Sequence, residues 1–376
     1  MPPEVQEVWT GPVISCVDLN AFYSSCEELR NHTLKGKSHA VIMTDQHKGL
    51  ITKGVVSTCS YEARKYGIKS AMPLSEALSL NPNLILLPVD ISYYRQVFKK
   101  VRGVLEKFAD VLEQASVDEA FLDCTIKRGN DQPEDYAMKI KNTVKSECDL
   151  LCSIGVTSTK ASSKIAADYR KPDGLTVVYP YNLKGFLESL AVSTVGGIGP
   201  QTQKKLMEKG IETLGQLATY DVQKLIQEFG INGKWMWNVA NGIYEEPVIP
   251  RGDHISIGTE STLVRHTRNK DKIKQVLEVL VDELHERAQK NGYLFRTVGI
   301  KLVRADFTIE TREITFQEFS DTKISISSEI GILLNRFAYS DDQPAIRKVG
   351  LKLSNLIRSY ELHKAKLIQK TIPDYF

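Results

Sequence analysis

Short apolar runs alternate with amphipathic stretches along the first half of the chain. The apolar runs have the length and alternation of strands and fall at residues 13–18, 40–43, 54–59, 84–87, 115–122, 151–156 and 175–178. The amphipathic stretches have helical spacing and fall at residues 20–29, 60–66, 73–80, 93–108, 134–148 and 159–169. This mixture predicts an α+β sheet covered by helices on one face.

Residues 179–242 change to an all-helical pattern. Within them, Gly196-Gly197-Ile198-Gly199-Pro200 precedes a predicted helix that runs through Leu206, in the manner of a helix-hairpin-helix. A turn at Gly197 and Gly199 would expose backbone amides at a helix N-terminus, which suits a DNA phosphate and ignores base sequence. The alternative is an ordinary glycine-rich turn between two helices.

Turn-forming residues mark a linker at residues 243–252, and a second α/β pattern follows it. Its predicted order is β-α-β-β-α-β, with elements at residues 256–263, 270–290, 296–304, 311–316, 325–337 and 346–353. The last residues, 363–376, read as an extended tail. We also expect tight turns at residues 46–49 and 171–174, where glycine follows polar residues or proline.

Composition is that of an ordinary globular protein. The chain has 376 residues, of which 42% are hydrophobic and 25% charged, and its formal net charge is +3. No apolar run is long enough to span a membrane, and the N-terminus does not resemble a secretory signal. Six scattered cysteines lack metal-binding spacing, so we expect reduced thiols in a cytoplasmic protein.

Acidic side chains at the predicted strands are the main candidates for chemistry. Asp118 and Glu119 lie within the apolar run 115–122, and Asp18 ends the run 13–18. If these two strands are neighbours, three carboxylates converge, and such a group suits two Mg²⁺ ions acting at phosphorus. The alternative is a pair of solvated acids at a turn or strand edge.

Lysines define a second candidate surface. In residues 346–354, Val349, Leu351 and Leu353 alternate with Lys348 and Lys352, so the apolar set should pack on helices. The lysines would then face outwards, joined by Lys301 from a neighbouring strand. They could contact a DNA backbone through salt-sensitive attraction, or they could simply form a solvated sheet face.

Four sequence blocks together resemble the signatures of Y-family, lesion-bypass DNA polymerases, most closely the archaeal members. The blocks are Asp18-Leu19-Asn20-Ala21-Phe22-Tyr23, Tyr61-Glu62-Ala63-Arg64, Ser116-Val117-Asp118-Glu119-Ala120 and Lys171-Pro172-Asp173-Gly174. The resemblance implies a right-handed polymerase with an additional domain. The palm would be residues 11–21 and 90–178, the fingers 22–89, the helical thumb 179–242, the linker 243–252 and the little finger 253–362.

The resemblance also implies roles for individual residues. Asp18, Asp118, Glu119 and the Leu19 carbonyl would bind two Mg²⁺ ions, with Mn²⁺ as a possible substitute. Tyr61, Arg64, Lys171, Thr58 and the backbone amides of Phe22 and Tyr23 would hold the triphosphate. The Tyr23 ring would exclude a ribose 2′-hydroxyl. Asn20 and Ala21 differ from many members and are not expected to touch the metals, while Val55 and Ser57 would form a roomy roof over the new base pair.

The tail suggests a protein partner. Gln369, Ile372, Tyr375 and Phe376 resemble the peptide that docks on ring-shaped sliding clamps. One helical turn would present the three apolar side chains as a plug. The alternative is a tail that folds back on its own domain.

The resulting hypothesis is a monomeric, template-directed translesion DNA polymerase of low fidelity that uses deoxynucleoside triphosphates on primer–template DNA. No segment carries the extra acid cluster of a proofreading exonuclease. Two alternatives stay open at this point. One is a nucleotide cyclase with a similar palm, and the other is a non-catalytic DNA-binding scaffold.

Overall fold

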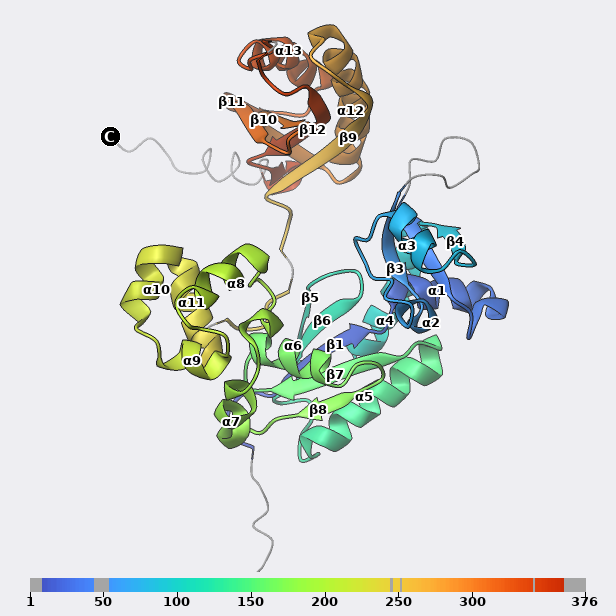
Figure 1. Cartoon of the computed structure of the whole chain (residues 1–376), viewed down its shortest axis with the longest axis vertical. Helices are drawn as coiled ribbons and strands as arrows, with labels where there is room; N and C mark the ends of the chain where they lie inside the picture. Colours follow the sequence, from blue (N-terminus) through green and yellow to red (C-terminus); the bar gives the residue numbers. More distant parts are fainter. Residues whose placement is uncertain (1–8, 44–53, 244–245, 251, 341, 362–376) are drawn as a thin grey trace, which may run out of the picture. The chain divides into compact units, whose positions relative to one another are not determined.

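The computed structural model describes residues 9–43, 54–243, 246–250, 252–340 and 342–361. Its contacts divide the chain into two units, Met1–Arg251 and Gly252–Phe376, each of which is described by itself (Figure 1). Within the described residues, no helix is both long enough and apolar enough to cross a membrane.

A five-stranded sheet forms the centre of the first unit. Its strands, in the order β5-β6-β1-β7-β8, are Val111–Gln114, Glu119–Asp123, Ile14–Leu19, Cys152–Thr157 and Leu175–Val177. All neighbours are antiparallel except β7 and β8, which are parallel and joined by helix α6 (Lys160–Tyr169). The central strand β1 is completely buried, so its terminal acid ends inside the fold rather than in solvent.

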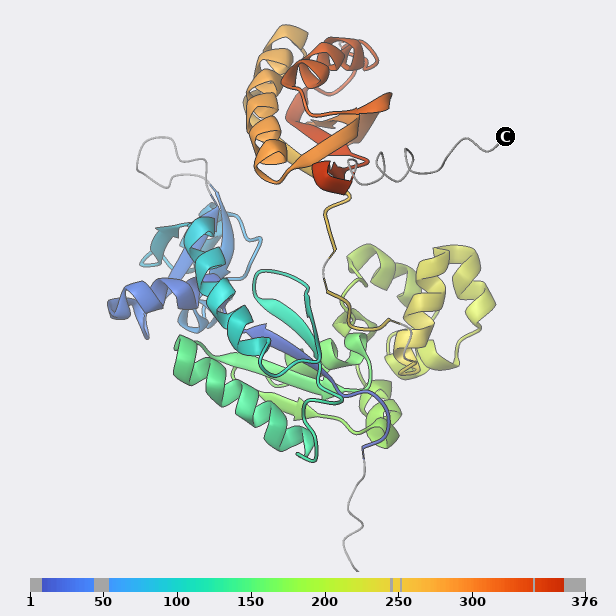
Figure 2. The same cartoon turned by 180° about the vertical axis from the view of Figure 1, so that it is seen from behind.

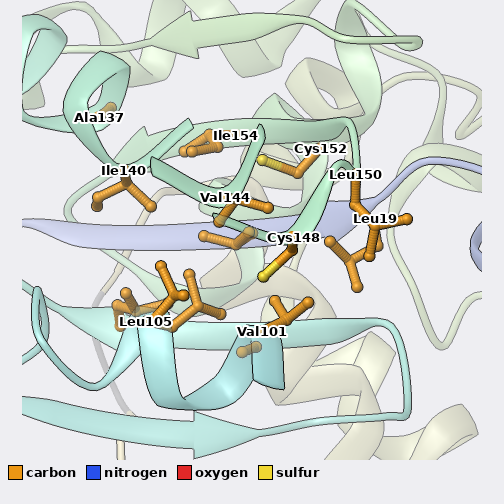
Figure 3. Close-up of a cluster of buried hydrophobic side chains, with 14 of the residues drawn as sticks. Leu19, Val101, Leu105, Ala137, Ile140, Val144, Cys148, Leu150, Cys152 and Ile154 are labelled. Atoms are coloured by element: carbon orange, nitrogen blue, oxygen red, sulfur yellow. The ribbon is translucent and has the colours of Figure 1, made fainter. Parts of the chain in front are cut away.

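Helices cover both faces of this sheet, which corrects the predicted one-sided arrangement. Helices α4 (Ile91–Leu105) and α5 (Pro133–Cys148) pack on the face that carries Val17 and Leu19 (Figure 3). Helix α6 packs on the opposite face, where the crossover between parallel strands leaves it. A Cβ atom at Gly155 of β7 would lie 2.1 Å from the Ser163 carbonyl oxygen, so glycine permits this close approach.

The segment between β1 and α4 builds a smaller layer. Helix α1 (Phe22–Arg30) leads to a three-stranded sheet in the order β3-β2-β4. These strands are Val55–Cys59, His39–Met43 and Ile85–Pro88, and the short helices α2 (Tyr61–Arg64) and α3 (Leu74–Leu80) follow β3. The layer has a core of its own, in which Ile42, Val56 and Ile68 are buried.

Residues 183–240 are helical, as predicted. The helices are α7 (Leu183–Glu188), α8 (Pro200–Met207), α9 (Leu214–Thr219), α10 (Val222–Phe229) and α11 (Ile231–Ala240). Their core includes Ile165 and Ala166 and therefore extends to α6, the helix that packs on the five-stranded sheet. Part of the predicted linker packs on the five-stranded sheet instead, because Val248 is buried with Cys16 of β1 and Phe121 of β6.

The second unit confirms the predicted β-α-β-β-α-β order (Figures 1 and 2). Its elements are β9 (Ser256–Thr267), α12 (Lys270–Lys290), β10 (Tyr293–Arg304), β11 (Ile309–Ser320), α13 (Lys323–Leu334) and β12 (Ile346–Ser354), followed by a short β13 (Ile357–Arg358). The main sheet has the order β11-β10-β12-β9. Val349, Leu351 and Leu353 pack with buried residues of α12 and α13, as the alternation predicts.

Two local predictions need correction or comment. The apolar run 115–122 was expected to be one strand, but residues 115–118 form the turn of a hairpin between β5 and β6, and β5 was not predicted. The predicted turn at residues 46–49 lies outside the described residues. All six cysteines are buried and unpaired, in agreement with the expected reduced thiols.

Candidate active site

Strand register brings the three predicted acids to one end of the sheet. Asp18, next to the end of β1, is paired with Glu119, the first residue of β6. Asp118 precedes Glu119 in the hairpin turn, and its carbonyl accepts a hydrogen bond from the Leu19 amide at 2.9 Å. The Ser116 hydroxyl contacts the Asp118 carboxylate and also accepts the Asp118 amide at 3.2 Å. This Ser-x-Asp turn therefore fixes the position of Asp118.

Two lysines from helix α6 and the turn after it contact these acids. Lys164 Nζ lies 2.5 Å from oxygens of both Asp18 and Glu119. Lys171 Nζ lies 2.7 Å from Asp18 and 2.7 Å from Asp168. Burial opposes the charge of Lys164, but Asp18 and Glu119 outweigh it and raise the pKa of this lysine. Burial also raises the pKa of Glu119, although Lys164 acts in the opposite direction.

The donor atoms at this end of the sheet suit a hard divalent cation, because carboxylate and carbonyl oxygens are the ligands that Mg²⁺ prefers. The contact of Lys164 with both Asp18 and Glu119 indicates that the acids already attract a cation between them. Among the described residues, however, no three acidic, histidine or cysteine side chains converge closely enough to hold an ion as they stand. An ion held by both Asp18 and Glu119 would take the position of the Lys164 ammonium.

A cleft of about 380 Å³ opens beside the acids and collects the predicted nucleotide-binding residues. It is lined by Asp18, Leu19, Asn20, Ala21, Phe22, Tyr23, Ser57, Thr58, Tyr61, Arg64, Ser70, Val117, Asp118 and Lys171. The Arg64 guanidinium lies over the Tyr61 ring, 4.7 Å from its centroid. Burial raises the pKa of Tyr61 even though Arg64 and Lys171 act to lower it. Tyr61 therefore stays a neutral hydrogen-bonding group beside two cations.

Tyr23 is held from behind by another tyrosine. Its ring stacks on Tyr94 of α4, with centroids 4.4 Å apart and an interplanar angle of 19°. Tyr94 in turn donates a hydrogen bond to Oε1 of the buried Glu27 at 2.6 Å. Burial and the charge of Asp118 raise the pKa of Tyr23, so its hydroxyl remains protonated near the acids. The stacking on Tyr94 thus fixes the position of the Tyr23 ring, which forms part of the cleft wall.

Asn20, which was expected not to act on a metal, connects three parts of the site. Its amide nitrogen donates to Ser153 Oγ on β7 at 3.0 Å. Its side-chain oxygen Oδ1 accepts a hydrogen bond from the Asp173 backbone amide at 2.8 Å. Asn20 therefore fixes the turn that carries Lys171 relative to β1. Ala21 then adopts a left-handed conformation (φ 44°) from which helix α1 begins, with Phe22 and Tyr23 as its first residues.

The predicted DNA contacts lie away from this cleft in sequence. Gly197 has φ +105°, and a Cβ atom there would lie 3.2 Å from the Trp235 ring, so both shape and conformation favour glycine. Gly199 is the N-cap residue of α8. In the second unit, Lys301, Lys348 and Lys352 lie on the open face of the sheet as predicted, but each is paired with a glutamate. Gln369, Ile372, Tyr375 and Phe376 lie outside the described residues.

Several residues of the site were not predicted. Lys164 and Asp168 lie on α6, whose buried residues are small or aliphatic, and nothing in their sequence context marked either side chain as part of the site. Tyr94 acts through contacts that depend on the tertiary fold, whereas Ser116 acts through a local bond to Asp118. Glu260 and Glu313, which pair with the lysines of the second unit, could only be found from strand register.

Comparisons with known proteins agree in both units. The impB/mucB/samB family matches residues 17–168, and the C-terminal domain of the same family matches residues 254–367. A DNA polymerase IV of Nitrosopumilus maritimus is 34% identical over 370 residues, covering 97% of this chain and 99% of the relative. A DNA polymerase IV of Methanoculleus marisnigri is 37% identical and covers 92% of this chain and 94% of the relative.

Solved structures are similar over nearly the same length. A Y-family DNA polymerase chimera of Dbh and Dpo4 has a TM-score of 0.84 at 29% identity, with 92% of this chain and 99% of that chain covered. The insertion ternary complex of Dbh DNA polymerase has a TM-score of 0.65 at 28% identity, with the same coverage.

Proposed function

The chain belongs to the impB/mucB/samB family, the Y family of DNA polymerases, and from this premise we propose that its catalytic centre is formed by Asp18, Asp118 and Glu119. It is a DNA-directed DNA polymerase that acts in lesion bypass and depends on a divalent metal. Its partners are primer–template DNA and deoxynucleoside triphosphates. The nucleotide cyclase and the non-catalytic scaffold are therefore set aside.

The observation that supports this centre most strongly is the register pair of Asp18 and Glu119, beside Asp118 and at the edge of the nucleotide cleft. We propose that these acids and the Leu19 carbonyl bind two Mg²⁺ ions, for which Mn²⁺ can substitute. Bound divalent ions would neutralise the triphosphate and help the primer 3′-hydroxyl to lose its proton. The protein's part is to hold the carboxylates close together and largely shielded from water.

The incoming triphosphate would bind in the same cleft. Arg64 offers a forked pair of donors, Lys171 a point charge and Tyr61 a neutral hydroxyl. The amides of Phe22 and Tyr23 begin a helix and favour negative charge, and Thr58 also lines the cleft. Because Asp168 also contacts Lys171, this lysine is held near Asp18 before a phosphate arrives.

Sugar selection would rest on Tyr23. Its ring lines the cleft and stacks on Tyr94, which prevents the ring from moving away from a ribose 2′-hydroxyl. On the side of the base pair, Ser57 lines the cleft and Val55 is exposed at the start of β3. These modest side chains fit a roomy site, and we therefore propose low fidelity without proofreading.

DNA would be held by sequence-independent contacts. We propose that the turn at Gly197 and Gly199 contacts a phosphate, and that Lys301, Lys348 and Lys352 contact the duplex backbone.

We further propose that Gln369, Ile372, Tyr375 and Phe376 dock on a sliding clamp and that the enzyme works as a monomer. Its place would be the cytoplasm of a prokaryote, where its DNA substrate lies in the nucleoid.

Primer extension with Mg²⁺ tests the catalytic assignment. Asp118→Asn should abolish template-directed extension while leaving primer–template affinity within about twofold, since the change removes a charge needed only at the reaction centre. Asp123→Asn provides a matched control, because Asp123 lies at the far end of β6, the strand that follows Asp118, and its carboxylate accepts hydrogen bonds from Thr125. Full extension by Asp118→Asn would show that these acids do not form the centre.

A further inference from the structure

The open face of the sheet in the second unit carries acids and lysines in two rows across the strands. In the first row, Gly350 of β12 is paired with Glu260 of β9 on one side and with Lys301 of β10 on the other. In the second row, Gly299 of β10 lies between Lys352 and Glu313. Each row therefore has an acid on one side of a glycine and a lysine on the other side.

The charged side chains meet across these glycines. Glu260 Oε1 lies 2.7 Å from Lys301 Nζ, and the other oxygen of Glu260 contacts Lys348. Glu313 Oε1 lies 3.4 Å from Lys352 Nζ. All three lysines predicted to hold DNA thus already form ion pairs with glutamates, and Glu260 alone pairs with two of them.

The glycines leave room for the glutamates to lie flat on the sheet. A Cβ atom at Gly350 would lie 2.9 Å from Cγ of Glu260, and one at Gly299 would lie 2.9 Å from Cγ of Glu313. The resulting groove has a volume of about 470 Å³. A larger residue at either glycine would lift the acid away from its lysine.

We propose that Glu260, together with Glu313, competes with DNA phosphates for the lysines of this face and so limits the affinity of the enzyme for primer–template DNA. This inference rests on the proposed function, in which Lys301, Lys348 and Lys352 contact the duplex backbone. Carboxylate and phosphate oxygens bind an ammonium in the same way, so both cannot use the same donors fully.

The pairing is weak enough to be exchanged. Glu260 and Lys301 have side chains that are 33% and 35% exposed, and ion pairs that water reaches to this extent are weak. Hydrogen bonds from Lys301 and Lys348 lower the pKa of Glu260, so the acid is ionised at neutral pH, where the lysines are charged. Lysines that stay paired with glutamates neutralise fewer phosphates, so fewer counterions leave the DNA and affinity becomes less sensitive to salt.

The test measures fluorescence anisotropy of a labelled primer–template duplex with the full chain, without nucleotide, over a range of salt concentrations. Glu260→Gln should bind about tenfold more tightly at low salt, and the slope of log affinity against log salt should steepen by about one to two, since two lysines become free. Gly350→Ala should act in the same direction without changing the charge, because it displaces the Glu260 side chain.

A matched control separates the effect of net charge on DNA affinity from the effect of the ion pairs. Glu278→Gln removes the same charge from α12, the helix that covers the opposite face of the sheet, and should leave affinity and slope unchanged. If Glu278→Gln tightens binding as much as Glu260→Gln, net charge explains the gain and the proposal is wrong. The proposal is also wrong if Glu260→Gln and Gly350→Ala both bind DNA as the wild type does.

A double variant distinguishes failure of the inference from failure of the proposed function. If Lys301→Gln with Lys348→Gln weakens binding while Glu260→Gln changes nothing, only the competition is refuted. If the double variant binds as tightly as the wild type, the lysine face does not hold DNA, and both ideas fail. Weaker binding by the double variant and tighter binding by Glu260→Gln support both.

Discussion

Replacing Lys164 with methionine should destabilise the first unit in Mg²⁺-free buffer and do so less when Mg²⁺ is present. The Lys164 side chain is 24% exposed, and its partners Asp18 and Glu119 are 11% and 17% exposed, so the cluster is largely buried. Removing one partner of a buried pair costs about 3–5 kcal/mol, and an exposed pair is worth about 0–1 kcal/mol. Because Lys171 still contacts Asp18, we expect a loss of about 2–3 kcal/mol in the free energy of unfolding.

Mg²⁺ bound by the same acids would replace the missing ammonium. In the wild type, the Lys164 ammonium would repel a Mg²⁺ ion about 5 Å away by about 1–2 kcal/mol in water. This repulsion is absent from Lys164→Met, which has no ammonium at this position. The difference in unfolding free energy between wild type and Lys164→Met should therefore shrink by about 1–2 kcal/mol at saturating Mg²⁺.

Denaturant unfolding followed by tryptophan fluorescence reports on the correct unit. All three tryptophans, Trp9, Trp235 and Trp237, lie in the unit Met1–Arg251. Lys160→Met is the matched control, because Lys160 lies on the same helix and contacts Glu113 at 2.8 Å, away from the three acids. The loss in this control should be the same in both buffers.

Two results would refute the reasoning. One is an equal loss for Lys164→Met with and without Mg²⁺, and the other is an equal Mg²⁺-dependent recovery for Lys160→Met. The pH dependence gives a further check. Because the pKa of Lys164 is raised in the folded state, its contribution is complete below the unfolded value of about 10.4 and is lost only as the pH rises through the folded value. The difference from wild type should therefore not change around neutral pH.

Three further variants test separate parts of the structure. Tyr94→Ala should remove the support of Tyr23 and raise ribonucleotide incorporation at least tenfold in single-nucleotide insertion, whereas Tyr94→Phe keeps the stacked ring and should retain discrimination. Arg304→Met should cost the second unit about 3 kcal/mol, visible as faster amide exchange in β10 and β12, because the buried guanidinium binds Glu310 and two carbonyls. Deleting residues 369–376 should leave basal synthesis unchanged and abolish stimulation by a sliding clamp; equal stimulation of both forms would refute the docking proposal.

The adjacency of Asp18 and Glu119 could be predicted because each acid interrupts or ends an apolar run. A buried strand that ends in an acid requires a nearby partner, and the four sequence blocks indicated which one. The position of Asp118 was harder to predict, since apolar residues on both sides continued the strand pattern. The Ser116 hydroxyl bonds to Asp118 and closes a turn there, and this local bond overrides the hydrophobic pattern.

Lys164 could not be assigned from its sequence context. A lysine within a helix is usually solvated, and its role here follows from α6 lying on the face of the sheet that carries Asp18. That placement depends on the crossover between β7 and β8 and on close packing at Gly155. The pairing of Glu260 with Lys301 likewise depends on which strands are neighbours across the sheet. Sequence periodicity gives the face on which each side chain lies but not its neighbour on the next strand.

The two lysine clusters differ in burial, and salt should therefore act on them differently. Lys164 and Asp18 are mostly shielded from solvent, whereas Lys301 and Glu260 are each about one-third exposed. Ions screen exposed charges over about 10 Å at 0.1 M salt and act much less on buried ones. Raising the salt concentration should thus weaken primer–template affinity steeply while changing the KM for the incoming nucleotide, measured at saturating DNA, much less. Equal sensitivity of both constants would mean that Asp18, Asp118, Glu119 and their lysines are open to bulk ions, which the burial of Asp18 argues against.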